Sequence, residues 1–413
     1  MHIAVIGAGV SGLVAARELA PHHQVTIFEA GAAPGGHAHT VDVTCGSRTY
    51  AVDTGFVVFN HRTYPELRRI LGELRIQSQP SEMSFSVRCD RTGVEYSGGS
   101  LNSLFAQRRN LLRPAFLRLL VDYVRFNRLA TGLLGPGERR TLGEYLNDAG
   151  FSRVFRDLYL VPMGAAVWSA DPSKFSRIPV RTFARFFYNH GLLGIWGKPH
   201  WLSIVGGARR YVEALIRPFR DRIHVRAPVV GVRRSSDQVT VAVAGAGEAR
   251  FDHVVFATHS DQALGALRDP SPQEREVLGA IEYQPNDVAL HTDTNVLPHR
   301  RRAWASWNYR IPPDRAAGVP TTYIMNRLQR LDAPQTYCVT LNQTDCIDGE
   351  TVIKRLRYHH PVFNQAAIDA QDRWGEINGA RRTWYAGAYW RYGFHEDGVI
   401  SGLRAARALM ACG

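Results

Sequence analysis

The start of the chain alternates between short apolar runs and a segment with helical periodicity. Residues 2–6 and 24–28 are mostly apolar, whereas the apolar positions of residues 11–20 recur at helical spacing. Apolar runs of this length are typical of strands buried on both faces of a parallel sheet. The pattern therefore predicts a strand–helix–strand unit at the start of the chain.

The same two periods organise the rest of the sequence. Helical spacing recurs in residues 67–74 and 211–216, and strand-like alternation predicts a β-meander over residues 229–257. We predict a mainly antiparallel sheet over residues 285–370, as the second half of the substrate domain. Residues 352–356 resemble a surface helix, and a turn at Gly398 precedes a final predicted helix over residues 402–410.

A change in composition marks a second domain. Aromatic residues, arginines and long apolar helical stretches dominate residues 81–201, and the 413 residues exceed what one core needs. We therefore predict two interleaved, discontinuous domains. The first comprises residues 1–80, 202–284 and 375–413, and the second comprises residues 81–201 and 285–374.

A glycine-rich turn joins the first strand to the helix, with the sequence Gly7-Ala8-Gly9-Val10-Ser11-Gly12. Gly7 permits the tight turn, Gly9 lets the backbone approach a pyrophosphate, and Gly12 allows close helix–strand packing. The N–H groups that open the helix attract phosphate. Glu29 lies 20 residues after Gly9, where a carboxylate can bind a ribose diol. The spacing therefore predicts a dinucleotide site.

The doublet Gly35-Gly36 favours FAD over NAD, because such a doublet follows the ribose carboxylate in flavoenzymes of the monoamine oxidase, protoporphyrinogen oxidase and phytoene desaturase group, which this segment resembles. Those families usually place arginine next, whereas this chain has His37. The near-match Gly245-Ala246-Gly247 lacks a third glycine, so we interpret it as a hairpin turn. A separate nicotinamide site is therefore not expected.

The resemblance to that group implies a Rossmann-like FAD-binding domain interleaved with an α+β substrate domain, an α/β fold of the amine oxidase and phytoene desaturase type. It places several further segments at the cofactor, and no cysteine lies between Gly387 and Gly402, so a non-covalent FAD is expected. The last helix would direct its N–H groups at the flavin. The implied cofactor residues are Gly7, Gly9, Val10, Ser11, Gly12, Glu29, Ala30, Gly35, Gly36, His37, Thr54, Gly55, Phe56, Val229, Ala257, Thr258, Gly387, Asp397 and Gly398.

A narrower resemblance covers essentially the whole chain. Its motifs include Asp53-Thr54-Gly55-Phe56-Val57-Val58-Phe59-Asn60, Asn189-His190-Gly191-Leu192-Leu193, Trp304-Ala305-Ser306-Trp307-Asn308-Tyr309 and Gly393-Phe394-His395-Glu396-Asp397-Gly398. These look like the NAD/FAD-binding amine-oxidase-like proteins of bacteria, which also resemble the flavin domain of plant cyclopropane fatty acid synthases. The resemblance implies oxidation or desaturation of methylated fatty acyl chains, beside a lipid methyltransferase.

Two other functions stay open. A flavin amine oxidase of the familiar type keeps a lysine near the flavin, and no lysine lies between Lys198 and Lys354, which weakens that interpretation. A non-catalytic FAD-bound partner of a lipid methyltransferase is the other alternative.

The net charge of the chain gives expectations about its substrate and its location in the cell. The net charge of +13 comes almost entirely from arginine, and residues 101–134 combine six arginines with an apolar pattern. A basic amphipathic helix can lie on an anionic membrane surface, although its apolar side can equally pack on its own domain. Residues 183–196 are a second candidate for the wall of an apolar tunnel. We expect a lipid-like substrate, no nucleic-acid partner, and a cytoplasmic location at the inner membrane surface.

Candidate site residues follow from chemistry. Glu396, His395, Asn308 and His190 are the polar groups expected to face a catalytic pocket, with Glu396 or His395 as a base. Trp307, Tyr323, Tyr389 and Trp390 are candidates for substrate-binding aromatic walls. The pair His359-His360 before Pro361 predicts a strand-to-turn junction and not a metal site, because further ligands are lacking.

Overall fold

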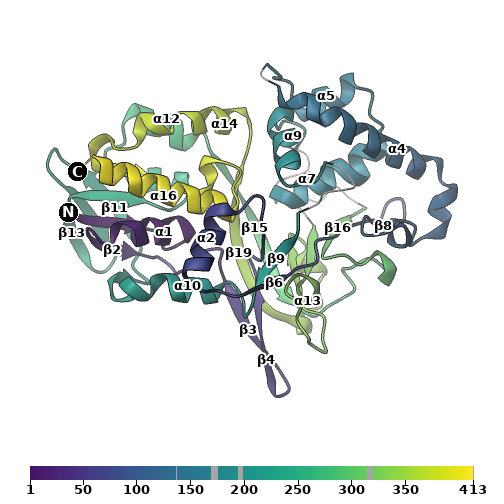
Figure 1. Cartoon of the computed structure of the whole chain (residues 1–413), viewed down its shortest axis with the longest axis horizontal. Coiled ribbons are helices and arrows are strands. Elements are labelled where there is room, and N and C mark those ends of the chain that lie inside the picture. Colours follow the sequence, from purple (N-terminus) through teal and green to yellow (C-terminus); the bar gives the residue numbers. More distant parts are fainter. Residues whose placement is uncertain (136, 169–174, 194–198, 314–319, 413) are drawn as a thin grey trace.

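A computed structural model describes residues 1–135, 137–168, 175–193, 199–313 and 320–412. Figure 1 shows two lobes side by side, joined by long central strands. One lobe holds both described ends of the chain, and the other holds most of the helices of the middle of the sequence. Mixed α/β architecture is thus the observed fold class.

A parallel five-stranded sheet forms the centre of the first lobe. Its order is β10-β2-β1-β14-β20, with bounds Ile223–His224, Gln24–Phe28, His2–Ile6, His253–Phe256 and Thr383–Tyr385. Ile3, Ala4 and Val5 are fully buried, as continuous apolar strands in such sheets are. With α1 (Val10–Leu19) between β1 and β2, the predicted strand–helix–strand unit is confirmed.

Helix α16 (His395–Ala411) lies against α1 in Figure 1. Two glycines allow this approach, because a Cβ at Gly402 would lie 2.4 Å from the carbonyl oxygen of Ser11, and one at Gly398 would lie 2.6 Å from Val10 Cγ1. The prediction that the helix starts at residue 402 was wrong. The glycines that resemble a turn in the sequence lie inside the helix, where they permit close helix packing.

A seven-stranded sheet lies beneath the helices of the second lobe and extends into the first lobe. Its order is β19-β15-β18-β17-β16-β7-β8, with bounds Val352–Val362, Glu282–His291, Cys338–Leu341, Thr321–Ile324, Trp307–Ile311, Phe85–Cys89 and Val94–Ser97. All pairs are antiparallel except β16 with β7. The mainly antiparallel sheet is confirmed. The surface helix predicted over residues 352–356 was wrong, because that segment pairs with β15 as part of β19.

The remaining strands form three smaller sheets. The predicted meander is present as β11 (Val229–Arg234), β12 (Val239–Val243) and β13 (Gly247–Phe251), and the hairpin through Gly245 is confirmed. Its predicted last strand was wrong, because the buried apolar strand β14 pairs in parallel with β1 and β20 and belongs to the five-stranded sheet. The other two sheets comprise β3 (Thr40–Cys45) with β4 (Arg48–Asp53), and β9 (Trp201–Ile204) between β5 (Val58–Asn60) and β6 (Ser78–Pro80).

Helices cover the sheet of the second lobe and pack around a phenylalanine-rich cluster that includes Phe126, Phe155 and Phe183. The amphipathic stretch predicted over residues 101–134 is not one helix, because Pro114 starts a new one. The lobe contains α3 (Leu101–Leu104), α4 (Pro114–Leu129), α5 (Leu142–Asp148), α6 (Arg153–Phe155), α7 (Val161–Trp168) and α9 (Val180–Asn189). Trp196, at the end of the second predicted tunnel wall, lies outside the described residues.

The remaining helices flank the first lobe and the central strands. They are α2 (Pro65–Glu73), α10 (Arg209–Ile216), α11 (Ser260–Ala266), α12 (Pro272–Gly279), α13 (Met325–Leu328), α14 (Gln365–Asp372) and α15 (Trp374–Ile377). Both helices predicted from residues 67–74 and 211–216 are present as α2 and α10.

Candidate functional site

A cavity of about 1640 Å³ connects the two lobes. It begins at the glycine-rich turn after β1, passes under the end of β19, and reaches Leu120 and Val124 of α4. Typical small-molecule pockets measure about 300–1,000 Å³. This cavity therefore has room for a dinucleotide and a second molecule together.

The glycine-rich turn forms one end of the cavity. Gly7 has φ +101°, and its N–H donates to the Phe28 carbonyl at 2.8 Å. Gly9, Val10 and Ser11 line the cavity at the start of α1, where helix N–H groups favour an anion. Gly12 lies behind the turn and does not line the cavity, since a Cβ there would be 2.0 Å from the Gly7 carbonyl oxygen.

Glu29 lies at the end of β2 in the same wall. Its carboxylate accepts hydrogen bonds from the N–H groups of Ala8 and Gly31, at 2.8 and 2.7 Å. A carboxylate has further lone pairs for ligand hydroxyl groups. The arrangement fits the ribose contact expected of this residue.

The doublet Gly35-Gly36 completes the cradle opposite Gly9. Both glycines have positive φ, +127° and +57°, and a Cβ at Gly36 would lie 3.1 Å from Gly9 Cα. The Gly35 N–H donates to the Ala8 carbonyl at 2.8 Å. Side chains larger than hydrogen would fill this part of the cavity, so the backbone itself is available to a phosphate.

His37 follows the doublet and lines the cavity. Its ring stacks on Tyr358 at 4.6 Å and lies 5.4 Å from His360. Its Nε2 is buried with no hydrogen-bond partner among the described residues. Burial, with the neighbouring His259 and His359, lowers the pKa of His37 to about 4. A buried nitrogen without a partner fits a phosphate or flavin oxygen as its missing acceptor.

A group of histidines around His37 was not expected from the sequence. His259, His359 and His360 all line the cavity, and burial lowers the pKa of His259 to about 4 and that of His360 to about 3. The pair His359-His360 lies within β19 and not at a turn. No group of metal-ligating side chains occurs in the part of the chain that the structure describes. The lowered pKa values make His37, His259 and His360 neutral hydrogen-bonding groups near pH 7.

The closing segment reaches the cavity one turn earlier than predicted. Gly387, Tyr389 and His395 line it, whereas Asp397 and Gly398 do not. Asp397 Oδ2 accepts from the Phe394 N–H at 3.0 Å and caps α16, and burial raises its pKa to about 6. Because α16 starts at His395, its first N–H groups, and not those after Gly398, are the ones near the cavity.

Two of the four candidate catalytic residues line the cavity. His395 stacks on Phe56 at 3.8 Å, and its Nε2 lies 2.6 Å from the Tyr211 hydroxyl; burial lowers its pKa to about 3. His190 stacks on Phe186 at 3.8 Å and its Nδ1 lies 3.0 Å from the Phe186 carbonyl. Both rings are held in place and neutral, which makes them positioning groups and weak proton acceptors.

The other two candidates lie away from the cavity. Both carboxylate oxygens of Glu396 accept hydrogen bonds at 2.9 Å, from the N–H groups of Glu66 and Leu67 at the start of α2. Asn308 is 3% exposed and bonds to Ser86, Ala305 and Thr322. The sequence-based assignment of Glu396 as a base is therefore inconsistent with this geometry, because Glu396 does not line the cavity and both of its carboxylate oxygens accept hydrogen bonds from the start of α2.

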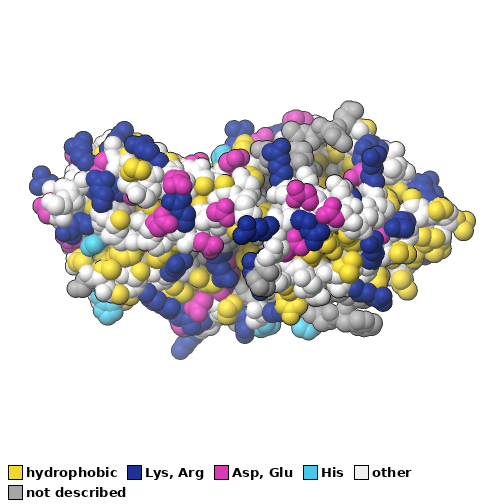
Figure 2. Space-filling view, turned by 90° about the horizontal axis from the view of Figure 1, so that it is seen from above, with side chains coloured by type: hydrophobic (Ala, Val, Ile, Leu, Met, Phe, Trp, Pro, Cys, Tyr) yellow, Lys and Arg dark blue, Asp and Glu magenta, His cyan; other side chains and the backbone are white. Residues whose placement is uncertain are grey.

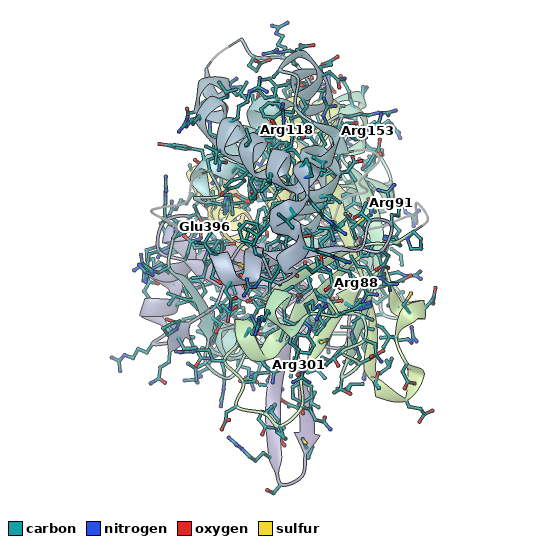
Figure 3. The ribbon with its side chains drawn as sticks, turned by 90° about the vertical axis from the view of Figure 1, so that its right-hand side faces the viewer. Arg88, Arg91, Arg118, Arg153, Arg301 and Glu396 are labelled. Atoms are coloured by element: carbon teal, nitrogen blue, oxygen red, sulfur yellow. The ribbon has the colours of Figure 1, made fainter. Side chains whose placement is uncertain are left out.

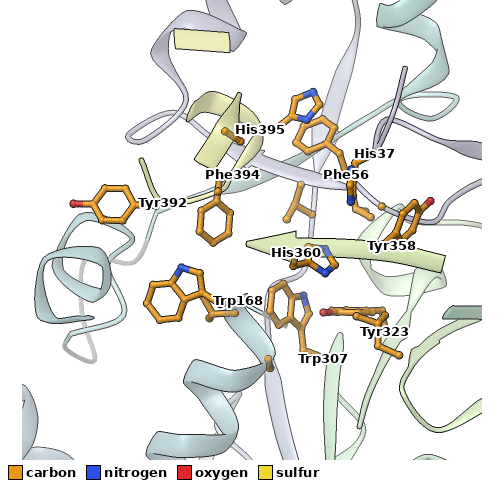
Figure 4. Close-up of a pocket in the computed structure, with 18 of the residues that line it drawn as sticks. His37, Phe56, Trp168, Trp307, Tyr323, Tyr358, His360, Tyr392, Phe394 and His395 are labelled. Carbon is orange, nitrogen blue, oxygen red and sulfur yellow. The ribbon is translucent and has the colours of Figure 1, made fainter. Parts of the chain in front are cut away.

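Aromatic rings surround the middle of the cavity, as Figure 4 shows. Trp307 and Tyr323 meet edge to face at 5.0 Å, and Trp168 and Phe394 lie across from them. Trp307, Tyr323 and Tyr389 line the cavity as expected, but Trp390 does not. Trp168, Tyr358 and Phe363 also line the cavity, although the sequence did not single them out as site residues.

Charge is nearly absent from the lining. Glu29 and Asp53 are the only carboxylate residues among the described lining residues, and neither lysine nor arginine occurs there. Asp53 is already bound by Thr40, Ala208 and Gln329, and burial raises its pKa to about 7. Lys354 is exposed on β19 and does not reach the cavity.

Comparison with known proteins agrees with this architecture. A sequence model described as flavin containing amine oxidoreductase matches residues 10–410. No curated protein matches the sequence.

Several solved structures share the fold. Cyclohexylamine oxidase from Brevibacterium oxydans IH-35A is 15% identical with a TM-score of 0.71, covering 99% of this chain and 98% of its own. A putative protoporphyrinogen oxidase from Exiguobacterium sp. 255-15 is 15% identical with a TM-score of 0.70, covering 100% and 99%. A fatty acid isomerase from P. acnes, described as CLA-producing, is 16% identical with a TM-score of 0.65, covering 98% of each chain. The predicted fold class is confirmed.

Proposed function

The chain belongs to the family of flavin containing amine oxidoreductases, and on that basis we propose that it uses non-covalently bound FAD to remove hydride from an apolar, lipid-like substrate. In its most specific form, the substrate is an unsaturated fatty acyl chain of a phospholipid, with or without a methyl branch. When bound, the flavin supplies the hydride acceptor. The protein residues bind and orient the substrate and exclude water from the cavity.

The uncharged lining of the cavity carries this proposal. An amine oxidase site is expected to combine an aromatic cage with anionic or carbonyl groups that bind the ammonium, yet Glu29 lies at the dinucleotide end and Asp53 is already bound by its neighbours. Beyond the aromatic rings the wall is apolar, with Leu104, Leu119 and Met163. Burying an unpaired charge there would be costly. A neutral hydrocarbon chain suits this wall better than an amine does.

The residues that would hold FAD are the ones that line the first half of the cavity. The helix start at Val10 offers backbone N–H groups to the pyrophosphate, the absence of side chains at Gly9 and Gly36 lets the backbone approach it, and Glu29 offers acceptors to the ribose. His395 and Phe56, stacked on each other, form a rigid wall beside the start of α16.

Anaerobic mixing tests the proposal. We expect unsaturated phospholipids, with or without a methyl branch, to bleach the flavin absorption, whereas saturated phospholipids and an amine panel leave it unchanged. Bleaching by amines alone would contradict the proposal and favour amine oxidation. A flavin that none of these compounds reduces, in a protein that binds a lipid methyltransferase, would indicate an accessory role instead.

A charge placed in the cavity provides a matched control for that experiment. Leu120 lines the cavity and is half-buried, whereas Val230 is 47% exposed and lies outside it. Leu120→Arg should slow reduction by lipid at least about tenfold, because an acyl chain cannot pair with the guanidinium. In Val230→Arg, lipid should reduce the flavin at the wild-type rate. Dithionite should reduce the flavin of both variants.

His37 provides a prediction about cofactor binding. Because its buried Nε2 lacks a partner, His37→Ala should weaken FAD binding by about 1.5–3 kcal/mol, the worth of one hydrogen bond to a charged group, which is roughly tenfold or more in Kd. His37→Arg should retain FAD, since arginine also donates to phosphate. Titration of flavin-free protein by fluorescence quenching measures both. Equal Kd values for wild type and His37→Ala would show that His37 does not contact the cofactor.

A further inference from the structure

Exposed apolar side chains concentrate on one end of the molecule. Seven of the thirteen exposed large hydrophobic residues of the described chain lie between residues 101 and 129: Leu101, Leu111, Leu112, Leu117, Val121, Val124 and Leu129. Leu112 is 86% exposed and Val121 is 60% exposed. Figure 2 shows hydrophobic side chains gathered at that end, with basic side chains among them, which are arginines within residues 101–134. We name these seven residues, which lie on α4 and on the segment directly before it, the α4 apolar face.

Helix α4 is apolar on two sides. Phe116, Leu119 and Phe126 are buried against the second lobe, so the expected packing of the helix on its own domain is satisfied by these residues. Leu117, Val121 and Val124 then form a second row at helical spacing, and their exposed fractions are 42%, 60% and 39%. Such a row is not required for folding, and exposed apolar patches mark interaction sites.

Cationic side chains surround this face. Residues 101–134 contain six arginines and one acidic residue, Asp122, which is fully buried and paired with Arg118 at 3.2 Å. Figure 3 faces this end of the molecule and shows Arg118 on the same side as Arg91 and Arg153, which are both exposed. The face therefore combines exposed hydrocarbon with positive charge, the combination that suits anionic lipid headgroups above an acyl layer.

The cavity opens beside the same face. Leu101, 75% exposed, and Val124, 39% exposed, both line the cavity. Leu120 and Val124 also line a shallow outer groove with Val121, Arg125, Arg128 and Leu129. One helix thus borders the cavity on its inner side and carries the exposed apolar row on its outer side.

From these observations we propose that the α4 apolar face docks on an anionic bilayer surface, and that an acyl chain reaches the cavity alongside α4. No described helix has the length and apolar composition needed to span a bilayer, so the contact is with the membrane surface. The docking itself does not depend on the proposed chemistry, whereas the passage of the acyl chain rests on it.

Co-sedimentation of the flavin-loaded protein with vesicles tests the docking. We expect binding to phosphatidylglycerol-containing vesicles, little binding to phosphatidylcholine vesicles, and weakening with salt. Arg113→Glu/Arg128→Glu should lower the partition coefficient at least about tenfold, since each basic residue near the surface contributes about 1 kcal/mol. Leu112→Ser/Val121→Ser should lower it by a similar factor, because both side chains are exposed.

Matched controls lie on other surfaces. Arg250 and Arg275 are exposed in the first lobe, and Val230 and Ile353 are exposed apolar residues away from α4. Arg250→Glu/Arg275→Glu and Val230→Ser/Ile353→Ser should change the partition coefficient less than about threefold. All variants should keep the wild-type Tm and flavin content.

Two results would overturn the docking proposal. One is equal vesicle binding by the wild type and both α4 variants. The other is a wild-type dimer that the α4 variants dissociate, without vesicle binding, because the face would then join two copies of the chain. Vesicle binding with no reduction of the flavin by any lipid would leave the docking intact and contradict the proposed function.

Discussion

Gly12→Ala is expected to abolish flavin binding and to destabilise the first lobe by about 3 kcal/mol or more, because overpacking of this severity displaces backbone. The added Cβ would lie 2.0 Å from the Gly7 carbonyl oxygen and 3.0 Å from Ala257 Cβ. Both neighbours belong to the core that joins β1, α1 and β14, so neither can rotate away as a flexible side chain would. Helix α1 would have to move away from the turn that it positions.

Gly9→Ala separates folding from cofactor binding at the same turn. No atom lies within 4 Å of a Cβ at Gly9, and its φ of −74° suits any residue. The apoprotein should therefore stay within about 1 kcal/mol of wild type, because alanine restricts the unfolded chain but is a poorer N-cap than glycine at the start of α1. The methyl group would nevertheless enter the cavity where the pyrophosphate is proposed to bind. We expect at least a hundredfold weaker FAD binding, on the order of 3 kcal/mol.

Chemical denaturation and the flavin-to-protein ratio measure the two effects independently. The pattern expected is loss of both properties in Gly12→Ala and loss of flavin alone in Gly9→Ala. Full flavin content in Gly9→Ala would show that the cofactor does not approach this backbone. Wild-type stability in Gly12→Ala would contradict the close helix–strand contact.

Replacing Glu396 is expected to lower stability far more than catalysis. Its carboxylate accepts hydrogen bonds from Glu66 and Leu67, and the residue is only 4% exposed. Glu396→Ala would leave two N–H groups at the start of α2 without acceptors, which should lower the free energy of unfolding by about 2–4 kcal/mol. Glu396→Gln keeps one acceptor and should lose about half as much.

The rate of flavin reduction by substrate should fall less than about tenfold in Glu396→Gln, measured per bound flavin, because the carboxylate does not reach the cavity; a catalytic base would contribute about 10²–10⁴-fold. Glu66→Gln makes the same change of charge at a half-buried neighbour and serves as the control. A stable Glu396→Gln protein with a hundredfold slower reduction would restore Glu396 as a base.

Local geometry explains why the cofactor half of the cavity could be predicted. The turn from Gly7 to Gly12 and the doublet Gly35-Gly36 need glycine for reasons that act within a few residues, namely positive φ and close approach of backbone. Such needs leave a visible pattern in the sequence. Glu29 follows β2 directly, so its position also depends mainly on local structure.

Errors arose where long-range contacts decide the structure. Residues 352–356 have no strong strand pattern of their own, but pairing with β15 across the whole length of β19 makes them a strand. The glycines at 398 and 402 resemble a turn, yet they let α16 pack on α1. Glu396 and Asn308 have side chains of types that often serve in catalysis. In this fold, however, partners distant in sequence bind their hydrogen-bonding atoms.

The sequence by itself determined the dinucleotide turn, the flavin family and the basic, amphipathic character of residues 101–134, since glycine spacing, motifs and hydrophobic period are properties of short segments. Only the tertiary structure decided which side chains share the cavity, that His37 lies with His259, His359 and His360, and that α4 leaves an apolar row uncovered beside the opening. These features depend on contacts between segments hundreds of residues apart, and hydrophobic burial is non-directional. The segments must therefore fold together before their shared surface exists.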